Sequence, residues 1–110
     1  MTQPTQPPKP PYYAVIFPNQ RTDADDAGYG EMAQHMTQLS EAQPGFLGMD
    51  STRGADGFGI TVSYWESEEA IAAWKANAEH LVAQKQGRNV WYDSFALHVA
   101  RVERNTVFNK

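Results

Sequence analysis

Two residues in the second half of the chain have side chains that could take part in chemistry, Trp74 and His80. An imidazole titrates near neutral pH and can act as a general base or as a metal ligand. An indole offers a flat apolar surface for a planar substrate. Both lie in the segment 64–92, which holds all three tryptophans and one of the three histidines. We therefore expect the catalytic candidates here, with His80 as the base and Trp74 as a wall of the pocket.

The orientation of these two side chains depends on a helix expected from Ser67 to about Gly87. Its apolar stripe consists of Ile71, Trp74, Ala78, Leu81 and Val82. At 100° per residue, His80 lies about 150° from the centre of this stripe and faces solvent if the helix is unbroken. A break near Asn77 would instead turn His80 toward the interior. Packing in the core is the alternative role for Trp74.

Three more residues are candidate substrate contacts because they stand near the ends of expected strands. Phe17 closes the apolar run 12–17, Asn19 follows Pro18, and Tyr64 lies near the end of the run 58–65. Their alternative role is ordinary loop or core packing. The other histidines, His35 and His98, are expected on a helix surface and on the sheet face of a dimer. We expect no metal site, because the histidines are scattered and the chain has no cysteine.

The elements that must position these residues follow the order β-α-β-β-α-β. They are expected at 12–17, 27–43, 46–51, 58–65, 67–87 and 91–104. Pro18 is expected to end the first strand, Asp25 or Asp26 to cap the first helix, and Pro44-Gly45 to end it. This order predicts an α+β, ferredoxin-like sheet with both helices on one face. Residues 1–11 form an expected disordered Pro-rich tail, 12–104 the domain, and 105–110 a C-terminal tail.

The sheet is expected to pair with a second copy of the chain. Helices can cover only one face, yet the run 12–17 is apolar on both faces. In the last strand Phe95, Leu97 and Val99 line one face, and the other carries Tyr92, Ala96, His98, Ala100 and Val102. An apolar face left uncovered favours association. We therefore predict a homodimer through the sheet face, with a small-molecule cleft between the sheet and helices of each subunit.

The composition excludes several classes of partner. The net charge of −4 disfavours nucleic acids and anionic membranes, which bind basic surfaces. No apolar run has the length of a membrane span, and the N-terminus lacks the apolar core of a signal peptide. The absence of cysteine fits a reducing compartment. We therefore expect a cytoplasmic protein.

Several motifs together resemble the antibiotic-biosynthesis-monooxygenase (ABM) superfamily. They are YAVIF at 13–17, PGFLG at 44–48, W-x5-H-x6-GR-x2-WY at 74–92 and VARVER at 99–104. Within it, the chain is similar to a branch related to haem-degrading monooxygenases. The resemblance implies a dimeric α/β barrel. It also implies a cofactor-independent monooxygenase acting on a small aromatic or quinol-like substrate.

Two alternatives remain open beside this function. Haem-degrading members carry an Asn on the first strand, a Trp on the second helix and an axial His about ten residues later. Trp74 matches, but Gln84 stands at the axial position, His80 is the only nearby histidine, and Asn19 is expected past the strand end. Haem binding or degradation is the first alternative. The second is a non-catalytic dimeric module that binds a small ligand.

Overall fold

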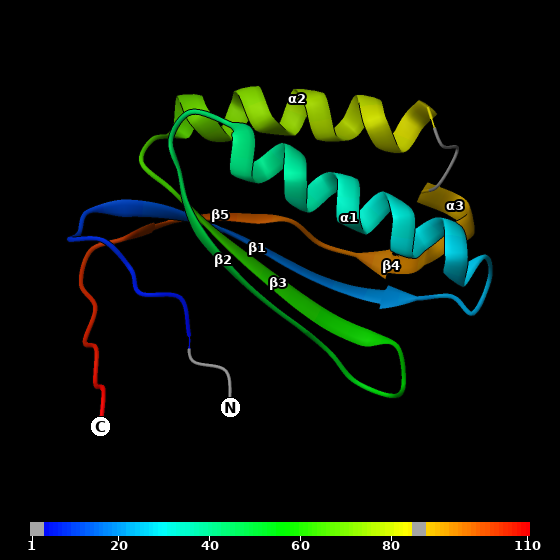
Figure 1. The fold of residues 1–110 in the computed structure, drawn as a ribbon, viewed down its shortest axis with the longest axis horizontal. Coiled ribbons are helices and arrows are strands. Elements are labelled where there is room, and N and C mark those ends of the chain that lie inside the picture. The colour runs from blue at the N-terminus through cyan, green and yellow to red at the C-terminus, as the bar shows by residue number, and fades with distance from the viewer. Residues whose placement is uncertain (1–3, 85–87) are drawn as a thin grey trace.

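The computed structural model describes the backbone of residues 4–84 and 88–110, and the side chains of all of these except 79–84 and 88–89 (Figure 1). The elements are β1 (Tyr12–Arg21), α1 (Asp26–Ala42), β2 (Phe46–Arg53), β3 (Phe58–Trp65), α2 (Glu68–Gln84), α3 (Arg88–Trp91), β4 (Tyr92–Phe95) and β5 (His98–Val102). The predicted βαββαβ order is confirmed, with the last strand in two parts.

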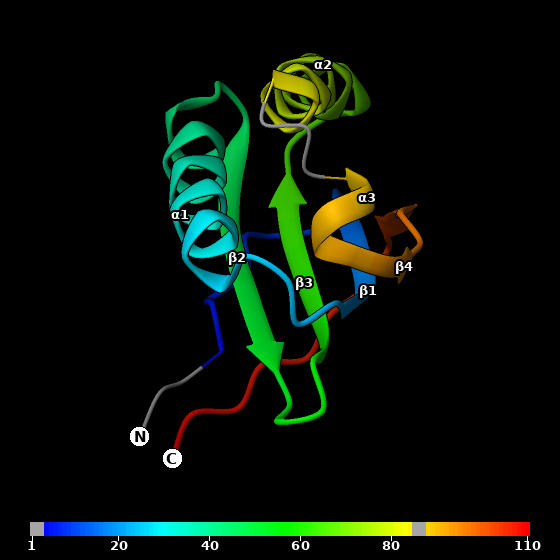
Figure 2. The same cartoon turned by 90° about the vertical axis from the view of Figure 1, so that its right-hand side faces the viewer.

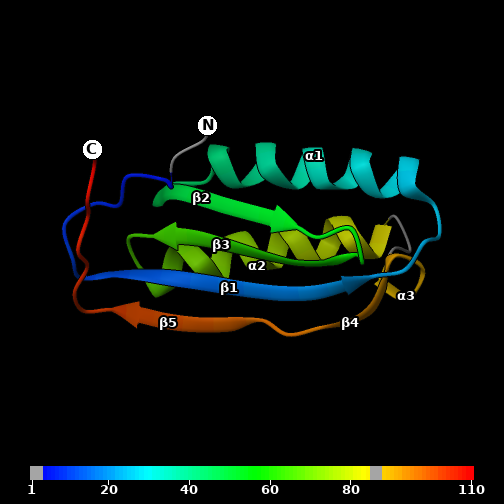
Figure 3. The ribbon, with the colours of Figure 1, turned by 90° about the horizontal axis from the view of Figure 1, so that it is seen from below.

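The strands form one antiparallel sheet in the order β2-β3-β1, and both β4 and β5 pair with the remaining side of β1. Both long helices lie on one side of the sheet (Figure 1). Figure 2 shows α1 beside β2 at one edge and α3 beside β4 at the other. Seen from below, the strands lie in front of α2 and no helix covers them (Figure 3). We call the two sides the helix face and the open face.

The core lies on the helix face. Val15, Trp65 and Ile71 are buried together, and the partly buried residues around them are Tyr13, Phe46, Ala70, Trp74 and Leu97. Trp65 is 0% exposed, and its Nε1 donates a hydrogen bond to Ser63 Oγ at 2.9 Å. Its indole also packs on Trp74 at 5.5 Å between ring centroids. The tryptophan pair therefore fixes α2 to the sheet.

Burial alternates along β3, as expected of a strand with one covered face. Gly59, Ser63 and Trp65 are buried on the helix face, whereas Phe58 and Ile60 on the open face are 45% and 37% exposed. Strand geometry produces this pattern, because successive side chains point to opposite faces.

The ends of α1 also agree with the sequence to within one residue. Asp25 is the N-cap, and its side chain accepts a hydrogen bond from Gly28 N. Gly45 follows the helix at φ 88°, in the left-handed region that glycine adopts readily.

The prediction that Pro18 ends the first strand is wrong, because β1 continues to Arg21. Pro18 O accepts a hydrogen bond from Ala96 N. In an antiparallel strand the N–H and C=O of one residue point to the same side. The missing N–H of Pro18 therefore faces the gap between β4 and β5, where the partner strand is already interrupted. Consequently Asn19 lies inside the strand and not beyond it.

The predicted last strand also differs from the structure. Trp91 belongs to α3, and residues 96–97 separate β4 from β5. The register between β1 and β4 shifts between Gln20 and Arg21. This irregularity places Tyr92 on the helix face, where its ring contacts Phe17 and Tyr29. The prediction that Tyr92 shares a face with His98 is therefore wrong.

The second helix passes Asn77 without a break and reaches Gln84. The break that would turn His80 inward is therefore absent. The predicted C-cap, Gly87, lies outside the described residues. None of the helices that the structure describes is long and apolar enough to cross a membrane.

Residues 4–11 contain no helix or strand, but one of them is held to the sheet. Thr5 N donates to Asp50 Oδ1 at 2.8 Å, and Thr5 Oγ1 donates to Met49 O at 2.7 Å. Asn105 Nδ2, from the other tail, donates to Pro8 O and to Tyr12 OH. The disorder of residues 1–11 stays a prediction.

Candidate functional site

The candidate site lies on the helix face along β1. Val15, Phe17 and Asn19 share this face because they alternate along the strand. Trp74 packs against the core at Val15 and Trp65. Asn19 lies four residues beyond Val15 along β1, which is about 13 Å at 3.3 Å per residue. We call this stretch of β1, with Phe17 near its centre, the floor. Val15 and Asn19 within it are 1% and 2% exposed, so protein side chains cover both residues.

A polar row crosses the sheet at the Asn19 end of this floor. The strand register places Arg53 of β2 opposite Gly59 of β3, and Gly59 opposite Asn19 of β1. Because Gly59 has no side chain, Arg53 can extend over β3, and its Nη2 donates to Asn19 Oδ1 at 2.7 Å. A Cβ at position 59 would lie 2.9 Å from Arg53 Cζ. The glycine therefore makes this contact possible.

Two tyrosines, Tyr29 of α1 and Tyr92 of β4, complete the polar row. Arg53 Nη2 donates to Tyr29 OH of α1 at 2.8 Å, and Tyr92 OH of β4 donates to the same oxygen at 3.4 Å. Burial raises the pKa of Tyr92 well above its ordinary value of 10.0, and the hydrogen bond to Tyr29 raises that pKa further. Tyr92 is therefore a neutral phenol across the physiological pH range.

Asn19 is almost fully buried, with 2% of its surface exposed. Its Nδ2 donates to Phe17 O at 3.0 Å while its Oδ1 accepts from Arg53. Both ends of the amide are thus satisfied, as a buried polar group requires. Asn19 therefore orients the Arg53 guanidinium from β1, and Tyr29 orients it from α1.

A second arginine, Arg21, lies beside this row and has a structural role. Its Nη2 pairs with Asp26 Oδ1 at 2.8 Å, and its Nη1 donates to Trp91 O at 2.6 Å. Its guanidinium also stacks on the Tyr29 ring at 3.9 Å. Arg21 therefore ties the start of α1 to α3, and the Asp26 carboxylate compensates its charge.

The structure brings together three of the five residues predicted for the site. Phe17, Asn19 and Trp74 share the helix face. Tyr64 lies on the open face, where its ring meets Tyr12 at 5.8 Å and its OH donates to Asp50 Oδ2 at 3.3 Å. Burial, with the Asp50 charge, raises the pKa of Tyr64. His80 belongs to α2, and its side chain lies outside the described residues.

Tyr64 therefore does not join the same site as Phe17, Asn19 and Trp74, because alternation along β3 sends it to the other side of the sheet. Sequence reasoning missed Arg53 for a related reason. It ended the second strand at Ser51 and placed Arg53 in a turn, whereas β2 continues to Arg53. Had the strand been extended by two residues, alternation from Ser51 would have placed Arg53 on the helix face.

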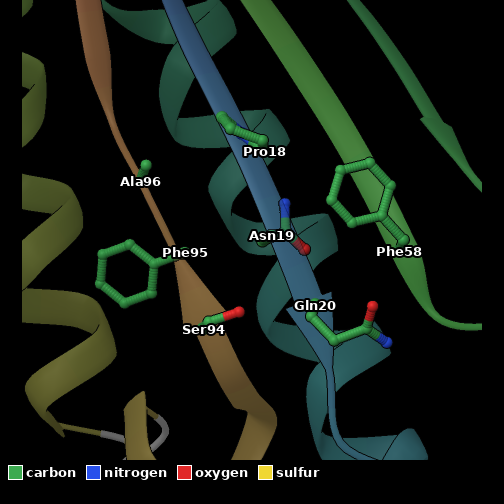
Figure 4. Close-up of a pocket in the computed structure, with 7 residues that line it drawn as sticks. All are labelled: Pro18, Asn19, Gln20, Phe58, Ser94, Phe95 and Ala96. Atoms are coloured by element: carbon green, nitrogen blue, oxygen red, sulfur yellow. The ribbon is translucent and has the colours of Figure 1, made fainter.

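The open face carries a shallow depression of about 440 Å³ (Figure 4). Figure 4 shows Phe58 of β3 on one side of Pro18, Asn19 and Gln20, and Ser94, Phe95 and Ala96 on the other. Phe58 and Phe95 are exposed large apolar residues at this place. The depression therefore belongs to the face that we expect a second copy to cover.

The described residues do not fit a haem site. His35 is exposed on α1, and His98 is exposed on β5, on the open face. Neither can supply an axial imidazole between the sheet and the helices. Asn19, the asparagine of the first strand, is already bonded at both ends of its amide.

The family model described as "ABM: Antibiotic biosynthesis monooxygenase" matches residues 13–86. The chain belongs to this family. The matched segment contains the whole polar row except Tyr92, and it contains Trp74. Haem-degrading members are not specifically indicated by this match.

The chain is also similar to one uncharacterized relative and, in fold alone, to two solved structures. The chain is 52% identical over 103 residues to the uncharacterized protein YqjZ of Bacillus subtilis (strain 168). The aligned segment covers 94% of this chain and 90% of that protein. Its fold is similar to that of SnoaB, a cofactor-independent oxygenase from Streptomyces nogalater, at a TM-score of 0.70 and 12% identity, covering 89% and 98% of the two chains. It is also similar to Rv0793 from Mycobacterium tuberculosis, at a TM-score of 0.71 and 15% identity, covering 87% and 99%.

Proposed function

We propose that this protein is a cofactor-independent monooxygenase that oxidises a small aromatic or quinol-like substrate on the helix face of its sheet. The observation that carries the proposal is the floor between Trp74 and the polar row, in a chain of the ABM family. Aromatic rings border this floor, and the polar row lies at its Asn19 end. The fold similarity to SnoaB, itself a cofactor-independent oxygenase, is further support.

The proposed reaction draws all its electrons from the substrate. A ring-activated CH₂ carbon loses its two hydrogens and gains one atom of O₂ as a carbonyl oxygen. The other oxygen atom leaves with the two hydrogens as water, so the atoms and electrons balance. The protein would exclude water, orient the ring and hold the negative charge that forms when the substrate loses a proton.

Trp74 is the residue that we propose to contact the substrate at the apolar end. Its Nε1 is buried and has no hydrogen-bond partner among the described residues. A buried polar group without a partner is uncommon and is available to a ligand. Phe17 would contact the ring from the floor, and the buried Asn19 would act through Arg53, which it orients.

The prediction that His80 acts as the base loses its structural support. Its inward orientation required a break near Asn77, and α2 has none. In an unbroken helix the periodicity directs His80 away from the apolar stripe. A His80→Ala variant therefore tests the role directly, and the exposed His35→Ala is its matched control.

We also propose that the protein acts as a homodimer joined through the open face. Phe58 and Ile60 are 45% and 37% exposed there. A large apolar side chain gains roughly 1.5–3 kcal/mol on passing from full exposure to burial, so each of these partly exposed side chains gains a fraction of that. A second copy would cover these residues.

Oxygen uptake tests the proposed activity. The wild-type protein should consume O₂ with members of a panel of anthrones, which carry the activated CH₂ carbon that the reaction needs, and Trp74→Ala should lose most of this activity. His35→Ala should behave as wild type. Loss in His80→Ala would support the base, whereas full activity would remove His80 from the mechanism. If the wild-type protein consumes no O₂ with any member of a broad panel, the non-catalytic ligand-binding module becomes the better description.

A further inference from the structure

One positive charge on the helix face has no carboxylate partner among the described residues. Arg53 donates to Gly57 O at 2.6 Å, to Asn19 Oδ1 and to Tyr29 OH, and all three acceptors are neutral. A guanidinium has five N–H groups, so two of them have no described acceptor. Arg21, the neighbouring arginine, is by contrast paired with Asp26.

Three acidic residues of the neighbouring loops and of the start of α1 are engaged elsewhere. Asp26 pairs with Arg21, and Asp56 Oδ1 accepts from Phe58 N. Asp25 accepts from Gly28 N and from Trp91 Nε1. The Arg53 charge is therefore held in place by neutral groups and is left for something outside the described residues.

The guanidinium is also accessible. Arg53 lies on the helix face by register, yet its side chain is exposed, as is that of Ser51 on the same strand and face. Figure 3 shows α1 along the β2 edge of the sheet, while α2 lies behind the middle strands. Because Arg53 and Ser51 are exposed, a small molecule can reach Arg53 from solvent at the β2 edge of the sheet.

The surroundings of Arg53 favour an aromatic anion over a simple inorganic one. Tyr29 and Tyr92 pack edge to face at 5.7 Å, and Tyr92 packs in the same way on Phe17 at 5.8 Å. A phosphate or sulfate gains little from such rings. A planar aromatic ring that carries one charged oxygen can pack on the rings and also bind the Arg53 guanidinium.

We propose that Arg53, oriented by Asn19 and Tyr29 across Gly59, binds the oxyanion of a planar aromatic ligand, either a carboxylate or a phenolate. The inference deepens the proposed function and rests on it for its catalytic meaning. It names the substrate class as an aromatic molecule bound in its anionic form. A phenolate is more electron-rich than the neutral phenol, so holding it would also favour electron transfer to O₂.

Binding can be measured without turnover, by isothermal titration in the absence of oxygen. The probes are 2-naphthoate against its neutral amide, and 4-nitrophenolate at mildly alkaline pH against nitrobenzene. A charge-assisted hydrogen bond contributes roughly ten- to a hundredfold in affinity. We expect each anion to bind about tenfold or more tightly than its neutral partner, and we expect this preference to disappear in Arg53→Gln.

The matched control is Arg101→Gln, because Arg101 is exposed on β5 and pairs with Glu103 at 3.2 Å. It should keep the preference for anions. If only 2-naphthoate binds better than its neutral partner, the recognised group is a carboxylate. If only 4-nitrophenolate does, the recognised group is a phenolate. The proposal is overturned if neither anion binds the wild type better than its neutral partner, or if folded Arg53→Gln, checked by circular dichroism, keeps the preference.

This outcome is independent of the oxygen-uptake test. Anion preference without O₂ consumption would retain the binding site and refute the oxygenase. Oxygen consumption with no anion preference would retain the oxygenase and refute the role of Arg53.

Discussion

Replacing Gly59 by Ala should destabilise the protein, and replacing Gly30 by Ala should stabilise it. Both are glycine-to-alanine changes, so they lower the entropy of the unfolded chain by a similar amount. They differ only in what the added methyl group meets. At Gly59 the new Cβ would lie 2.8 Å from Thr52 O and 2.9 Å from Arg53 Cζ. At Gly30 no heavy atom outside the backbone of its own helix lies within 4 Å.

The sizes of the two effects follow from these contacts. Thr52 O belongs to β2, in the ladder with β3, so it cannot retreat without disturbing strand pairing. Forcing a methyl group into such a space costs about 1–3 kcal/mol. Gly30 lies within α1, where alanine is favoured over glycine by about 0.5–1 kcal/mol. For a domain of this length, Gly59→Ala should lower the Tm by roughly 5–15 °C. Gly30→Ala should raise the Tm by roughly 2–5 °C.

Thermal unfolding followed by circular dichroism would measure both shifts, at one fixed protein concentration because the assembly contributes to stability. Gly59→Ala should also displace Arg53 and reduce the preference for aromatic anions, which Gly30→Ala should leave unchanged. Equal shifts of the same sign in the two variants would refute the packing argument. A stable Gly59→Ala protein with full anion preference would show that Arg53 does not need the space over Gly59.

Two other predictions concern the buried tyrosine and the open face. The pKa of Tyr92 in the folded protein lies well above 10.0. Above about pH 10 the Tyr92 phenol therefore loses its proton only in the unfolded chain. Its contribution to the free energy of unfolding is complete below that pH and falls as the pH rises above it. Urea unfolding at increasing pH should show this loss, and the loss should be smaller in Tyr92→Phe; equal slopes in the two proteins would contradict it. Ile60→Glu should convert the proposed dimer to a monomer in light scattering at micromolar concentration, whereas Ala73→Glu on the exposed side of α2 should not. A wild-type monomer under these conditions would exclude the dimer.

The sequence by itself determined the order of elements and the face of most side chains. Alternation in β3, a cap at Asp25 or Asp26 and the stop at Pro44-Gly45 are local features with local causes. Each depends on the periodicity of one segment or on the backbone preference of one residue, so each can be derived without knowing the neighbours.

Only the tertiary structure decided the composition of the candidate site. Pro18 is tolerated inside β1 because its missing N–H faces the gap between β4 and β5. Tyr92 faces the helices because the β1–β4 register shifts beside Arg21. Arg53 meets Asn19 because a glycine stands between them on the intervening strand. Each of these facts depends on which residues of different strands lie opposite one another, and strand register is set by pairing across the sheet, not by any single segment.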